Sequence, residues 1–440
     1  MRHIFLYGPP GVGKSTLGRL LAERLARPFI DLDAEIEAAS GQPIADVMKA
    51  HGEPFFRDLE SAQLRAVVER APSVIALGGG ALLRPENRAL AESSGRVILL
   101  WADETTLRER LASQPHIRPL LAEDLSGKLS DLLAHRKAHY ESFEFRVANI
   151  SQQPEETLEK IQQKTGTYHI VNGGAAHDIL PLPGDFSRLA DALQWAGLRP
   201  PLALVTDSNI APRYAEFILV QLQSAGWGSA EAFHQIILPP GEEQKNAATL
   251  QGLWRQFLEA GLDRKSTVLA LGGGVIGDLT GFAAATFMRG VPWVNIPTSL
   301  LAMVDASLGG KTGIDLPEGK NLAGAFYPPR LVLVNPSVLK TLPVAEFRSG
   351  LAEVVKHGVI GDPELFALCA QGWDAVQSHL DDVIQRAMAV KIRIVEADPY
   401  ERGVRAALNL GHTVGHAVEA VSNFTIRHGE AVAIGMAAEA

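Results

Sequence analysis

The stretch His-Ile-Phe-Leu-Tyr-Gly-Pro-Pro-Gly-Val-Gly-Lys-Ser-Thr, residues 3–16, decides the fold of the first part of this 440-residue chain. Its apolar start predicts a buried strand, and the residues after the glycine-rich turn show a helical pattern. Glycines let backbone N–H groups curl around phosphates, while Lys14 neutralises their oxygens and the Ser15 hydroxyl can hold Mg²⁺. We therefore expect a nucleoside triphosphate here; a chance glycine-rich turn is the weaker alternative.

The composition narrows the possible partners. Hydrophobic residues make up 46% of the chain, charged residues 21%, and the net charge is -9. This acidic balance argues against nucleic-acid or membrane partners and favours small-molecule substrates. Cys369 is the only cysteine, and the N-terminus shows no signal-like or membrane-spanning stretch, so we predict a cytoplasmic protein.

Two successive alternations of apolar and amphipathic segments predict an α/β fold. The first, residues 1–164, indicates a P-loop kinase domain with a parallel sheet covered by helices. After a linker at 165–169, residues 170–336 indicate a Rossmann-like α/β domain, and residues 337–440 a helical metal-binding region. The chain ends within an apolar helical run that has no capping glycine or proline, which predicts that the helical region is incomplete.

Polar residues follow the predicted strands of the first domain. Asp31-Leu32-Asp33 and Gly78-Gly79-Gly80 both stand at strand ends, where ligands collect in an open α/β sheet. Several arginines accompany them. One acid for hydroxyl groups and several arginines for a carboxylate and a transferred phosphoryl group suit a small hydroxy acid. The arginines are Arg57, Arg110, Arg118 and Arg136.

At these residues the first domain resembles shikimate kinase over nearly all of 1–164. The motifs are Gly8-x-x-Gly11-x-Gly13-Lys14-Ser15-Thr16-x-Gly18, Asp31-x-Asp33, Phe56-Arg57-x-x-Glu60, Gly78-Gly79-Gly80 and Arg118-Pro119-Leu120-Leu121. One departure is Arg136-Lys137-Ala138-His139-Tyr140, where the family usually shows Arg-x-Pro-Leu-Tyr.

The resemblance to shikimate kinase implies roles for particular residues. Asp33, Arg57, Gly79 and Arg136 would bind shikimate, with Asp33 helping to deprotonate its attacking hydroxyl. Arg118 would lie in a lid that closes on the phosphates and Arg110 near adenine; Lys14 and Arg118 join Asp33 as catalytic residues. ATP and Mg²⁺ would be held, with Ser15 as metal ligand, by Gly11, Val12, Gly13, Lys14, Ser15 and Thr16.

A second glycine-rich turn, Leu271-Gly272-Gly273-Gly274-Val275-Ile276-Gly277-Asp278, again joins a strand to a helix but has no lysine in the P-loop position. Alone it is a weak signal, and a simple tight turn is an equal alternative. Asp207 follows another strand, where an acid can accept ribose hydroxyls, and Glu242 and Lys245 lie in a further charged turn. A dinucleotide fits this setting better than a triphosphate.

Histidines and a glutamate near the end of the chain suggest a metal site. His412 and His416 share a helix face, Glu353 and His357 form another i,i+4 pair, and His428 follows in a loop. Spacing alone leaves open which three residues bind the metal. Basic residues among glycines and apolar residues suit a substrate phosphate and carboxylate: Arg289, Lys311, Lys320, Lys356, Lys391 and Arg405.

From Tyr168 to its end the chain resembles 3-dehydroquinate synthase. The motifs are Pro240-Gly241-Glu242-x-x-Lys245, Gly272-Gly273-Gly274-Val275-Ile276-Gly277-Asp278, Gly309-Gly310-Lys311-Thr312-Gly313, Gly319-Lys320-Asn321, Ala352-Glu353-x-x-Lys356-His357-Gly358, Asn409-x-Gly411-His412-Thr413-x-Gly415-His416 and His428-Gly429-Glu430.

This second resemblance implies a site that uses NAD and Zn²⁺, with Co²⁺ as an alternative metal. Glu353, His412 and His428 would ligate the metal, and His416 and Lys311 would be catalytic, with His416 transferring a proton near the departing phosphate. The substrate would contact Asp305, Lys311, Asn321, Lys356, Lys391, Arg405 and Asn409. NAD would contact Asp207, Glu242, Lys245, Gly274, Val275, Ile276, Gly277, Asp278, Thr298, Ser299 and Lys320. Arg289 would reach a partner subunit's site in a homodimer formed through this module.

Together the resemblances predict a bifunctional enzyme of the shikimate pathway, which makes aromatic amino acids. The kinase would convert shikimate to shikimate 3-phosphate, and the synthase would cyclise 3-deoxy-D-arabino-heptulosonate 7-phosphate to 3-dehydroquinate with release of phosphate. Two alternatives remain: a second module that is another sugar-phosphate cyclase or a metal-dependent alcohol dehydrogenase, and a non-catalytic nucleotide sensor.

Overall fold

The structure, a computed structural model, describes residues 2–440 except 114–124, 151–152, 173–174, 183 and 423–424. The chain divides into two compact units, residues 1–165 and 166–440. Each unit has its own sheet and its own buried core. We therefore describe each unit by itself.

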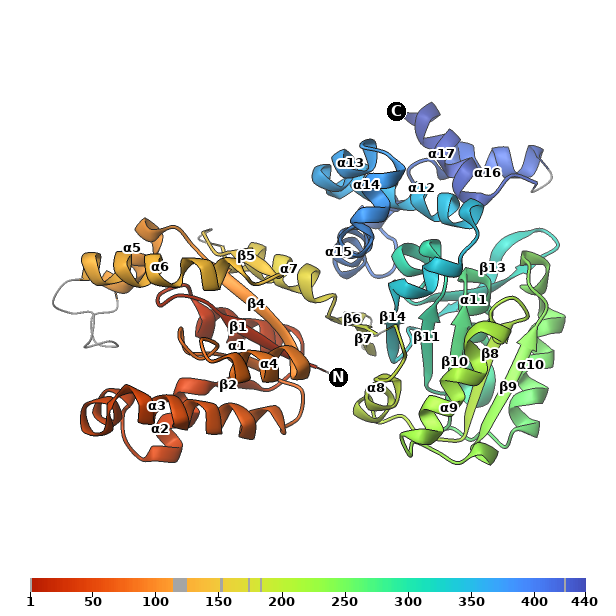
Figure 1. The fold of residues 1–440 in the computed structure, drawn as a ribbon. Helices are drawn as coiled ribbons and strands as arrows, with labels where there is room; N and C mark the ends of the chain where they lie inside the picture. The colour runs from red at the N-terminus through yellow and green to blue at the C-terminus, as the bar shows by residue number, and fades with distance from the viewer. Residues whose placement is uncertain (1, 114–124, 151–152, 173–174, 183, 423–424) are drawn as a thin grey trace. The chain divides into compact units, whose positions relative to one another are not determined.

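Unit 1 is built on a five-stranded parallel sheet with the order β2-β3-β1-β4-β5. Apolar residues fill both faces of its strands because helices cover both sides (Figure 1). The strands are β1 (His3–Tyr7), β2 (Phe29–Asp31), β3 (Val74–Ala76), β4 (Gly95–Trp101) and β5 (Arg146–Ala148). The helices are α1 (Lys14–Arg24), α2 (Leu32–Ser40), α3 (Ile44–Val68), α4 (Pro85–Ser94), α5 (Glu104–Ala112), α6 (Leu125–Glu141) and α7 (Pro154–Thr165).

Unit 2 contains a seven-stranded sheet with the order β6-β7-β14-β11-β10-β8-β9, parallel apart from the β6–β7 hairpin. Its strands are β6 (Tyr168–Asn172), β7 (Ala175–Pro181), β8 (Leu202–Asp207), β9 (Phe233–Leu238), β10 (Thr267–Gly272), β11 (Trp293–Pro297) and β14 (Leu331–Val334). Helices of this part are α8 (Leu189–Trp195), α9 (Glu216–Ser224), α10 (Ala247–Glu259) and α11 (Gly274–Thr286). Shorter turns are η2 (Ala211–Ala215), η3 (Ala230–Ala232), η4 (Glu242–Gln244), η5 (Phe287–Arg289), η6 (Ala302–Ala306) and η7 (Pro336–Thr341).

The remainder of unit 2 is helical and gathers beyond one end of the sheet (Figure 1). Its elements are α12 (Val344–Gly361), α13 (Pro363–Ala370), α14 (Trp373–Ser378), α15 (Leu380–Ala397), η8 (Val404–Asn409), α16 (His412–Val421) and α17 (His428–Glu439). None of the helices within the described part of the chain is long and apolar enough to cross a membrane.

The fold class agrees with the prediction, but two local features differ. The linker between the two units is shorter than the predicted 165–169. Helix α7 runs to Thr165, and β6 begins at Tyr168, whose ring is buried. An antiparallel hairpin of β12 (Lys311–Leu316) and β13 (Gly319–Phe326) was not anticipated. Its glycine-rich, charged sequence lacks a clear apolar alternation, since much of β13 is exposed.

Candidate active sites

The P-loop of unit 1 joins β1 to α1. Gly13 takes a left-handed conformation with φ 90° directly before the helix, so the loop turns sharply and presents the N-terminus of α1. The buried Lys14 ammonium donates to the carbonyl oxygens of Gly8 and Pro9 at 2.9 and 3.0 Å. Lys14 is thus held inside the loop, where it would meet phosphate oxygens.

Ser15, the predicted Mg²⁺ ligand, donates its hydroxyl to Asp31 Oδ2 at 2.6 Å. Asp31 ends β2, and its other oxygen accepts the Asp33 N–H at 3.2 Å, which caps α2. A hydroxyl and a carboxylate at this distance form an oxygen-rich corner that suits Mg²⁺. The sequence prediction gave no role to Asp31, although it was part of the Asp-x-Asp motif.

Arg110, which is predicted to lie near adenine, donates to the Asn149 carbonyl at 2.9 Å. The Asn149 amide donates to the Val12 carbonyl at 2.7 Å, so the residue after β5 braces the P-loop. Asn149 was missed because a single asparagine after a weak strand carries no distinctive pattern. Arg118 lies outside the described residues.

The predicted substrate residues of unit 1 converge after β3. A side-chain carbon on Gly78 would lie 2.8 Å from Asp33 Oδ1 and 3.0 Å from Glu60 Oε1. Arg57 binds Glu60 at 2.7 Å and Glu53 at 2.9 Å. Burial raises the pKa of Glu60, although the Arg57 charge opposes this shift. A side chain at position 78 would therefore collide with both carboxylates, so glycine is required there.

Arg136 completes this pocket from α6. Its Nη1 atom donates to the Gly79 carbonyl at 2.7 Å, and the hydroxyls of Tyr140 and Tyr7 lie 3.0 and 3.2 Å from the same oxygen. Glu60, Tyr7 and Tyr140 carried no role in the prediction. The positions of Asp33, Arg57, Gly79 and Arg136 in one pocket agree with the predicted convergence; their binding roles stay proposals.

In unit 2 the second glycine turn joins β10 to α11, so backbone N–H groups of the helix start face the carboxyl end of the sheet. Thr298 after β11 donates its N–H to the Gly272 carbonyl at 2.9 Å, and Ser299 lies beside Gly273. Asp207 ends β8, where its carboxylate caps the following turn by accepting from the N–H of Asn209. These strand ends form one edge, as a dinucleotide site requires.

A buried charge group lies next to this edge. Lys245 forms an ion pair with Asp278 at 2.7 Å, lies 3.9 Å from Glu242, and also binds the Asn321 side chain. Burial alone would lower the pKa of Lys245, but the carboxylates of Asp278 and Glu242 raise it. Lys245 is therefore a fixed positive centre between α11 and the β12–β13 hairpin.

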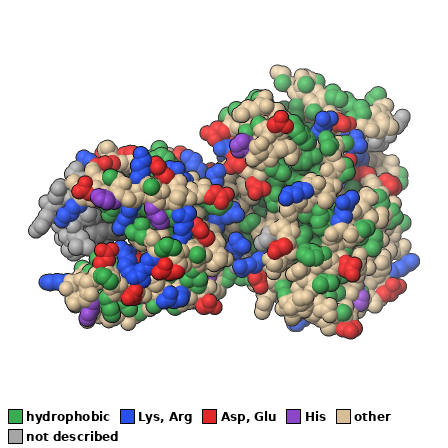
Figure 2. Space-filling view, viewed as in Figure 1, with side chains coloured by type: hydrophobic (Ala, Val, Ile, Leu, Met, Phe, Trp, Pro, Cys, Tyr) green, Lys and Arg blue, Asp and Glu red, His purple; other side chains and the backbone are tan. Residues whose placement is uncertain are grey.

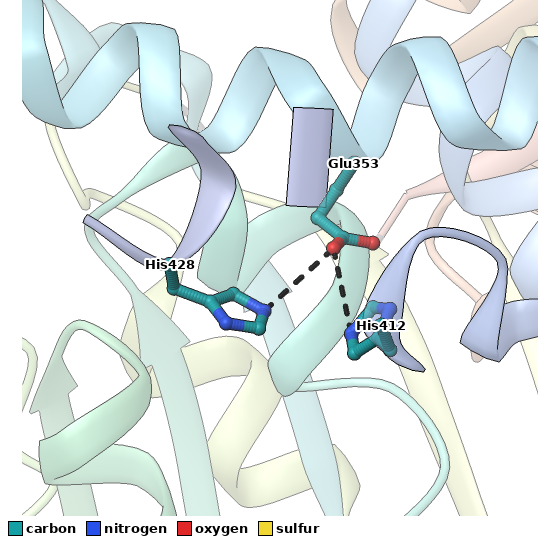
Figure 3. A group of neighbouring side chains, drawn as sticks. All are labelled: Glu353, His412 and His428. Atoms are coloured by element: carbon teal, nitrogen blue, oxygen red, sulfur yellow. Dashed lines mark ion pairs between the residues drawn. The ribbon is translucent and has the colours of Figure 1, made fainter. Parts of the chain in front are cut away.

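The metal-type residues of unit 2 meet around one carboxylate oxygen (Figure 3). Glu353 Oε1 lies 3.9 Å from His412 Nε2 and 3.8 Å from His428 Nε2. Glu353 is fully buried on α12, and its Oε1 has no hydrogen-bond partner in the described part of the chain. Ligand atoms around a tetrahedral zinc ion are roughly 3.4 Å apart, so the three residues fit such an ion after a small inward shift.

Two helix starts place the histidines, since His412 and His428 are the first residues of α16 and α17. Burial, with Lys356 and His428 nearby, lowers the pKa of His412 to about 4. A neutral imidazole is the form that binds a metal. His416 is exposed, with its ring centroid 5.3 Å from that of His412.

The sequence left open which histidines bind a metal together with Glu353. The surroundings of His357 differ from those of His412 and His428. His357 is buried and lies 3.7 Å from Asp305, so Asp305, Glu353 and His357 form another compact group. Asp305 already pairs with Lys391 at 2.5 Å, and Lys356 contacts the second oxygen of Glu353. The lysine charges lower the pKa of Asp305 although burial would raise it. Lysines therefore already neutralise the carboxylates next to His357. The Glu353 oxygen that faces His412 and His428 has no lysine partner among the described residues.

Several basic and polar side chains surround Glu401, a residue to which the prediction gave no role. Glu401 binds Lys311 and accepts from the Asn409 amide at 3.0 Å. Arg405 is buried and donates to the Pro399 carbonyl at 2.5 Å. Lys320 pairs instead with the buried Glu419 at 3.4 Å, and Glu419 lies 3.5 Å from His428 Nδ1. Interleaved acids such as Glu401 and Glu419 give no spacing signal, so only the fold reveals them.

Arg289 does not join these groups. It follows α11, whose 13 residues carry it roughly 20 Å from the glycine turn, at the opposite edge of the sheet. Its side chain is exposed. Its predicted role at a partner's site stays a proposal.

The surface carries no simple charge pattern on the face in view. Figure 2 shows Lys and Arg side chains interspersed with Asp and Glu side chains, with hydrophobic groups scattered between them. The distinctive charges of this protein are the buried ones, including Lys245, Glu353 and Lys391. Buried charges of this kind mark functional sites more often than surface charges do.

The two folds and their sites define a P-loop small-molecule kinase joined to an α/β enzyme with nucleotide- and metal-type sites. Family models match the chain in three parts: shikimate kinase at 10–165, 3-dehydroquinate synthase N-terminal at 235–349 and 3-dehydroquinate synthase C-terminal at 350–440. The chain belongs to the 3-dehydroquinate synthase family and carries a shikimate kinase domain before it, so it is a bifunctional kinase and lyase of the shikimate pathway.

Known relatives support this assignment. The 3-dehydroquinate synthase of Synechocystis sp. is 50% identical over 266 residues, which are 59% of this chain and 73% of that protein. That of Pelobacter propionicus is 48% identical over 60% of this chain and 74% of its own length. The 2-epi-5-epi-valiolone synthase of Streptomyces hygroscopicus, solved with NAD⁺ and Zn²⁺ bound, is 30% identical with a TM-score of 0.53, covering 60% of this chain and 73% of its own.

A further solved relative is 2-deoxy-scyllo-inosose synthase with carbaglucose-6-phosphate, NAD⁺ and Co²⁺, at 27% identity and a TM-score of 0.54 over 61% of this chain and 74% of its own. The models of both synthase domains match, the second through residue 440, and the chain spans 73% and 74% of the length of the two synthases named above.

Proposed function

We propose that unit 1 transfers the γ-phosphoryl group of ATP to shikimate, and that unit 2 converts 3-deoxy-D-arabino-heptulosonate 7-phosphate into 3-dehydroquinate with release of phosphate. The observation that carries the first half is the cluster in which Asp33, Arg57 and Arg136 meet the glycines after β3, next to the P-loop. The second half rests on the three-residue metal group beside the basic residues of unit 2.

In the kinase, the arginines and the carboxylate would bind different groups of the substrate. Arg57 and Arg136 offer planar donors to the carboxylate of the hydroxy acid. Asp33, at the first turn of α2, would orient the attacking hydroxyl and accept its proton. Lys14 would neutralise the phosphate charge, and Ser15 with Asp31 would hold Mg²⁺, which draws charge from the transferred group.

In the synthase, Glu353, His412 and His428 would hold Zn²⁺ or Co²⁺, because both metals accept two imidazoles and a buried carboxylate oxygen, here Oε1, which has no hydrogen-bond donor among the described residues. When bound, the metal acidifies a substrate hydroxyl and NAD accepts and returns a hydride. The α11 N-terminus and the strand ends near Asp207 and Thr298 would bind the dinucleotide.

The other residues of unit 2 would bind and orient the sugar phosphate. Lys356, Lys391 and Asp305 line the buried side of the site, where they would hold substrate hydroxyls. Lys311, Arg405 and Asn409 gather around Glu401 and supply positive charge and donors for the phosphate. The exposed His416 stands beside His412 and would move a proton near the departing phosphate.

We also propose a homodimer formed through unit 2, in which the exposed Arg289 contacts the partner's substrate. A cytoplasmic location is proposed because the chain has a single cysteine and both reactions use small soluble metabolites. Sedimentation of the purified chain at several concentrations would test the dimer: a purely monomeric species at micromolar concentration would contradict it.

Two assays test the proposed function. Purified protein should form ADP with ATP and shikimate, and, after loading with NAD and Zn²⁺, release phosphate from 3-deoxy-D-arabino-heptulosonate 7-phosphate without net NADH. Another sugar-phosphate cyclase would act on a different sugar phosphate, as the relatives with other named products do. Accumulating NADH would indicate an alcohol dehydrogenase, and ATP binding without turnover a sensor.

A further inference from the structure

The Gly79 carbonyl in the kinase pocket has more donors than a peptide oxygen normally accepts. Arg136 Nη1 lies 2.7 Å from it, Tyr140 Oη 3.0 Å and Tyr7 Oη 3.2 Å. A carbonyl oxygen has two lone pairs, so three donors compete for it unless a fourth group directs one of them. His139 is that fourth group, because its Nε2 atom lies 3.0 Å from the Tyr7 hydroxyl.

Burying the hydroxyl of Tyr7 costs free energy at this position. Tyr7 is the last residue of β1 and is fully buried, where an apolar side chain would fill the same space. A buried hydroxyl without a partner costs free energy, so the Tyr7 hydroxyl must be satisfied by Gly79 and His139. Burial raises the pKa of Tyr7 far above its usual range, so the hydroxyl keeps its proton and remains a donor.

His139 stands where shikimate kinases usually have an apolar residue, in the Arg136-Lys137-Ala138-His139-Tyr140 segment of α6. Its ring packs edge-on against Tyr7 and Phe143, with centroids 5.7 and 5.2 Å apart. When His139 Nε2 carries a proton it donates to the Tyr7 oxygen, which leaves the Tyr7 proton for Gly79. When Nε2 carries no proton, it accepts a hydrogen bond from the Tyr7 hydroxyl, which then no longer donates to Gly79.

Holding one side of a peptide fixes its other side. The Gly79 carbonyl and the Gly80 N–H belong to one planar unit and point in opposite directions. Donors on the carbonyl therefore turn the Gly80 N–H away from α6. Gly80 faces Arg57, since a side-chain carbon on Gly80 would lie 2.6 Å from Arg57 Nη2. The orientation of this peptide thus sets the backbone surface that faces Arg57.

We propose that Tyr7 and His139 are positioning residues that hold the Gly79–Gly80 peptide for the hydroxy-acid substrate and so set the affinity for shikimate rather than for ATP. This inference rests on the proposed function of unit 1. Tyr7 and His139 act through Gly79 and need not touch the substrate, in contrast to Arg136, which shares the same carbonyl.

The test uses the full chain and steady-state kinase assays on three variants. Tyr7→Phe removes only the hydroxyl, His139→Leu removes the ring nitrogens, and His139→Gln retains a polar end that can reach Tyr7. Tyr7→Phe and His139→Leu should raise the KM for shikimate about 2- to 10-fold, with kcat and the KM for ATP within about 2-fold of the parent. His139→Gln should recover part of the loss.

A control variant and a binding measurement separate positioning from folding. His135→Leu changes an exposed histidine on the same helix and should leave every constant unchanged. Calorimetric titration with shikimate should show the same loss of affinity while the melting temperature stays within a few degrees. Unchanged shikimate affinity in Tyr7→Phe and His139→Leu, or an equal loss for ATP, would overturn the inference. A parent protein that does not phosphorylate shikimate would instead overturn the proposed function, and this inference with it.

Discussion

At the scale of single residues, the proposed metal group of unit 2 contains a carboxylate whose burial is costly unless cations lie beside it. Glu353 is fully buried, and burial together with Asp305 raises its pKa. Lys356 contacts one oxygen, while the other faces two imidazole nitrogens. A cation in this position would offset the cost of burying the acid, which is a physical reason for a glutamate here.

Glu353→Gln should reduce synthase activity at least about 100-fold and weaken zinc binding to a similar degree, because a neutral amide is a poor zinc ligand. Kinase activity should stay unchanged, since unit 1 holds none of these residues. Zinc content after dialysis and competition with a fluorescent chelator measure the effect. Glu364→Gln, at an exposed side chain, is the matched control. Full zinc retention in Glu353→Gln would contradict the assignment.

Asp33→Asn should lower kcat of the kinase by roughly 100- to 10,000-fold, because the amide cannot accept the proton of the attacking hydroxyl. The KM for ATP should change little, since Lys14 and the P-loop are intact. ADP formation coupled to NADH oxidation by auxiliary enzymes measures kcat. Asp58→Asn, at an exposed carboxylate, should behave like the parent. A kcat within 3-fold of the parent would exclude Asp33 as the base.

At the scale of elements, three helices must pack closely to bring the metal group together. Gly435 on α17 faces α16 so tightly that a side-chain carbon there would lie 1.9 Å from the Gly411 carbonyl. Gly429 faces α12 in the same way, 1.9 Å from the Ser349 carbonyl. These contacts fix the helix starts that carry His412 and His428 relative to Glu353.

Gly435→Ala should therefore move α17 away from α16 and weaken zinc binding about 10-fold or more, with a lower melting temperature for unit 2. The added methyl group has no room, and both neighbours are backbone atoms. Ala433→Ser, at an exposed position of the same helix, serves as control. Zinc affinity and synthase activity equal to those of the parent would show that the helix packing does not set the ligand geometry.

His177 in the β6–β7 hairpin should make unit 2 less stable in acid. His177 on β7 is buried, neither ring nitrogen has a hydrogen-bond partner among the described residues, and burial lowers its pKa to about 4. The unfolded chain binds the proton near pH 6.5, so the folded state favours the neutral ring. The stability due to this neutral ring is fully present above about pH 6.5 and is lost as the pH falls towards 4.

His177→Leu should remove up to about 3 kcal/mol of this pH dependence. Urea unfolding at pH 7.5 and 5.0, followed by tryptophan fluorescence, measures it, because five of the six tryptophans lie in unit 2: Trp195, Trp227, Trp254, Trp293 and Trp373. The gap between the two midpoints should shrink in His177→Leu and persist in the exposed His379→Gln control. An unchanged gap in His177→Leu would contradict the explanation.

At the scale of the whole molecule, two units with separate cores and separate sites share one chain. The two reactions are not consecutive in the pathway, so direct transfer of an intermediate is not expected. Lys14→Met should abolish phosphorylation of shikimate and leave phosphate release by the synthase within 2-fold of the parent. Parallel assays on one preparation measure both. A large loss of synthase activity would reveal coupling between the units.

The sequence by itself determined the two α/β modules and the P-loop, because those features depend on local spacing: glycines at a strand end and a lysine before a helix. Spacing suggested a metal site but left open which of the histidines join it. The tertiary structure decided which distant groups meet. It set the neighbours of Glu353, and it brought Tyr7 to Gly79 and His139 to Tyr7, although 72 and 132 positions separate these pairs in the sequence. Such contacts depend on how elements pack, and no pattern along the chain records which side chains will lie together.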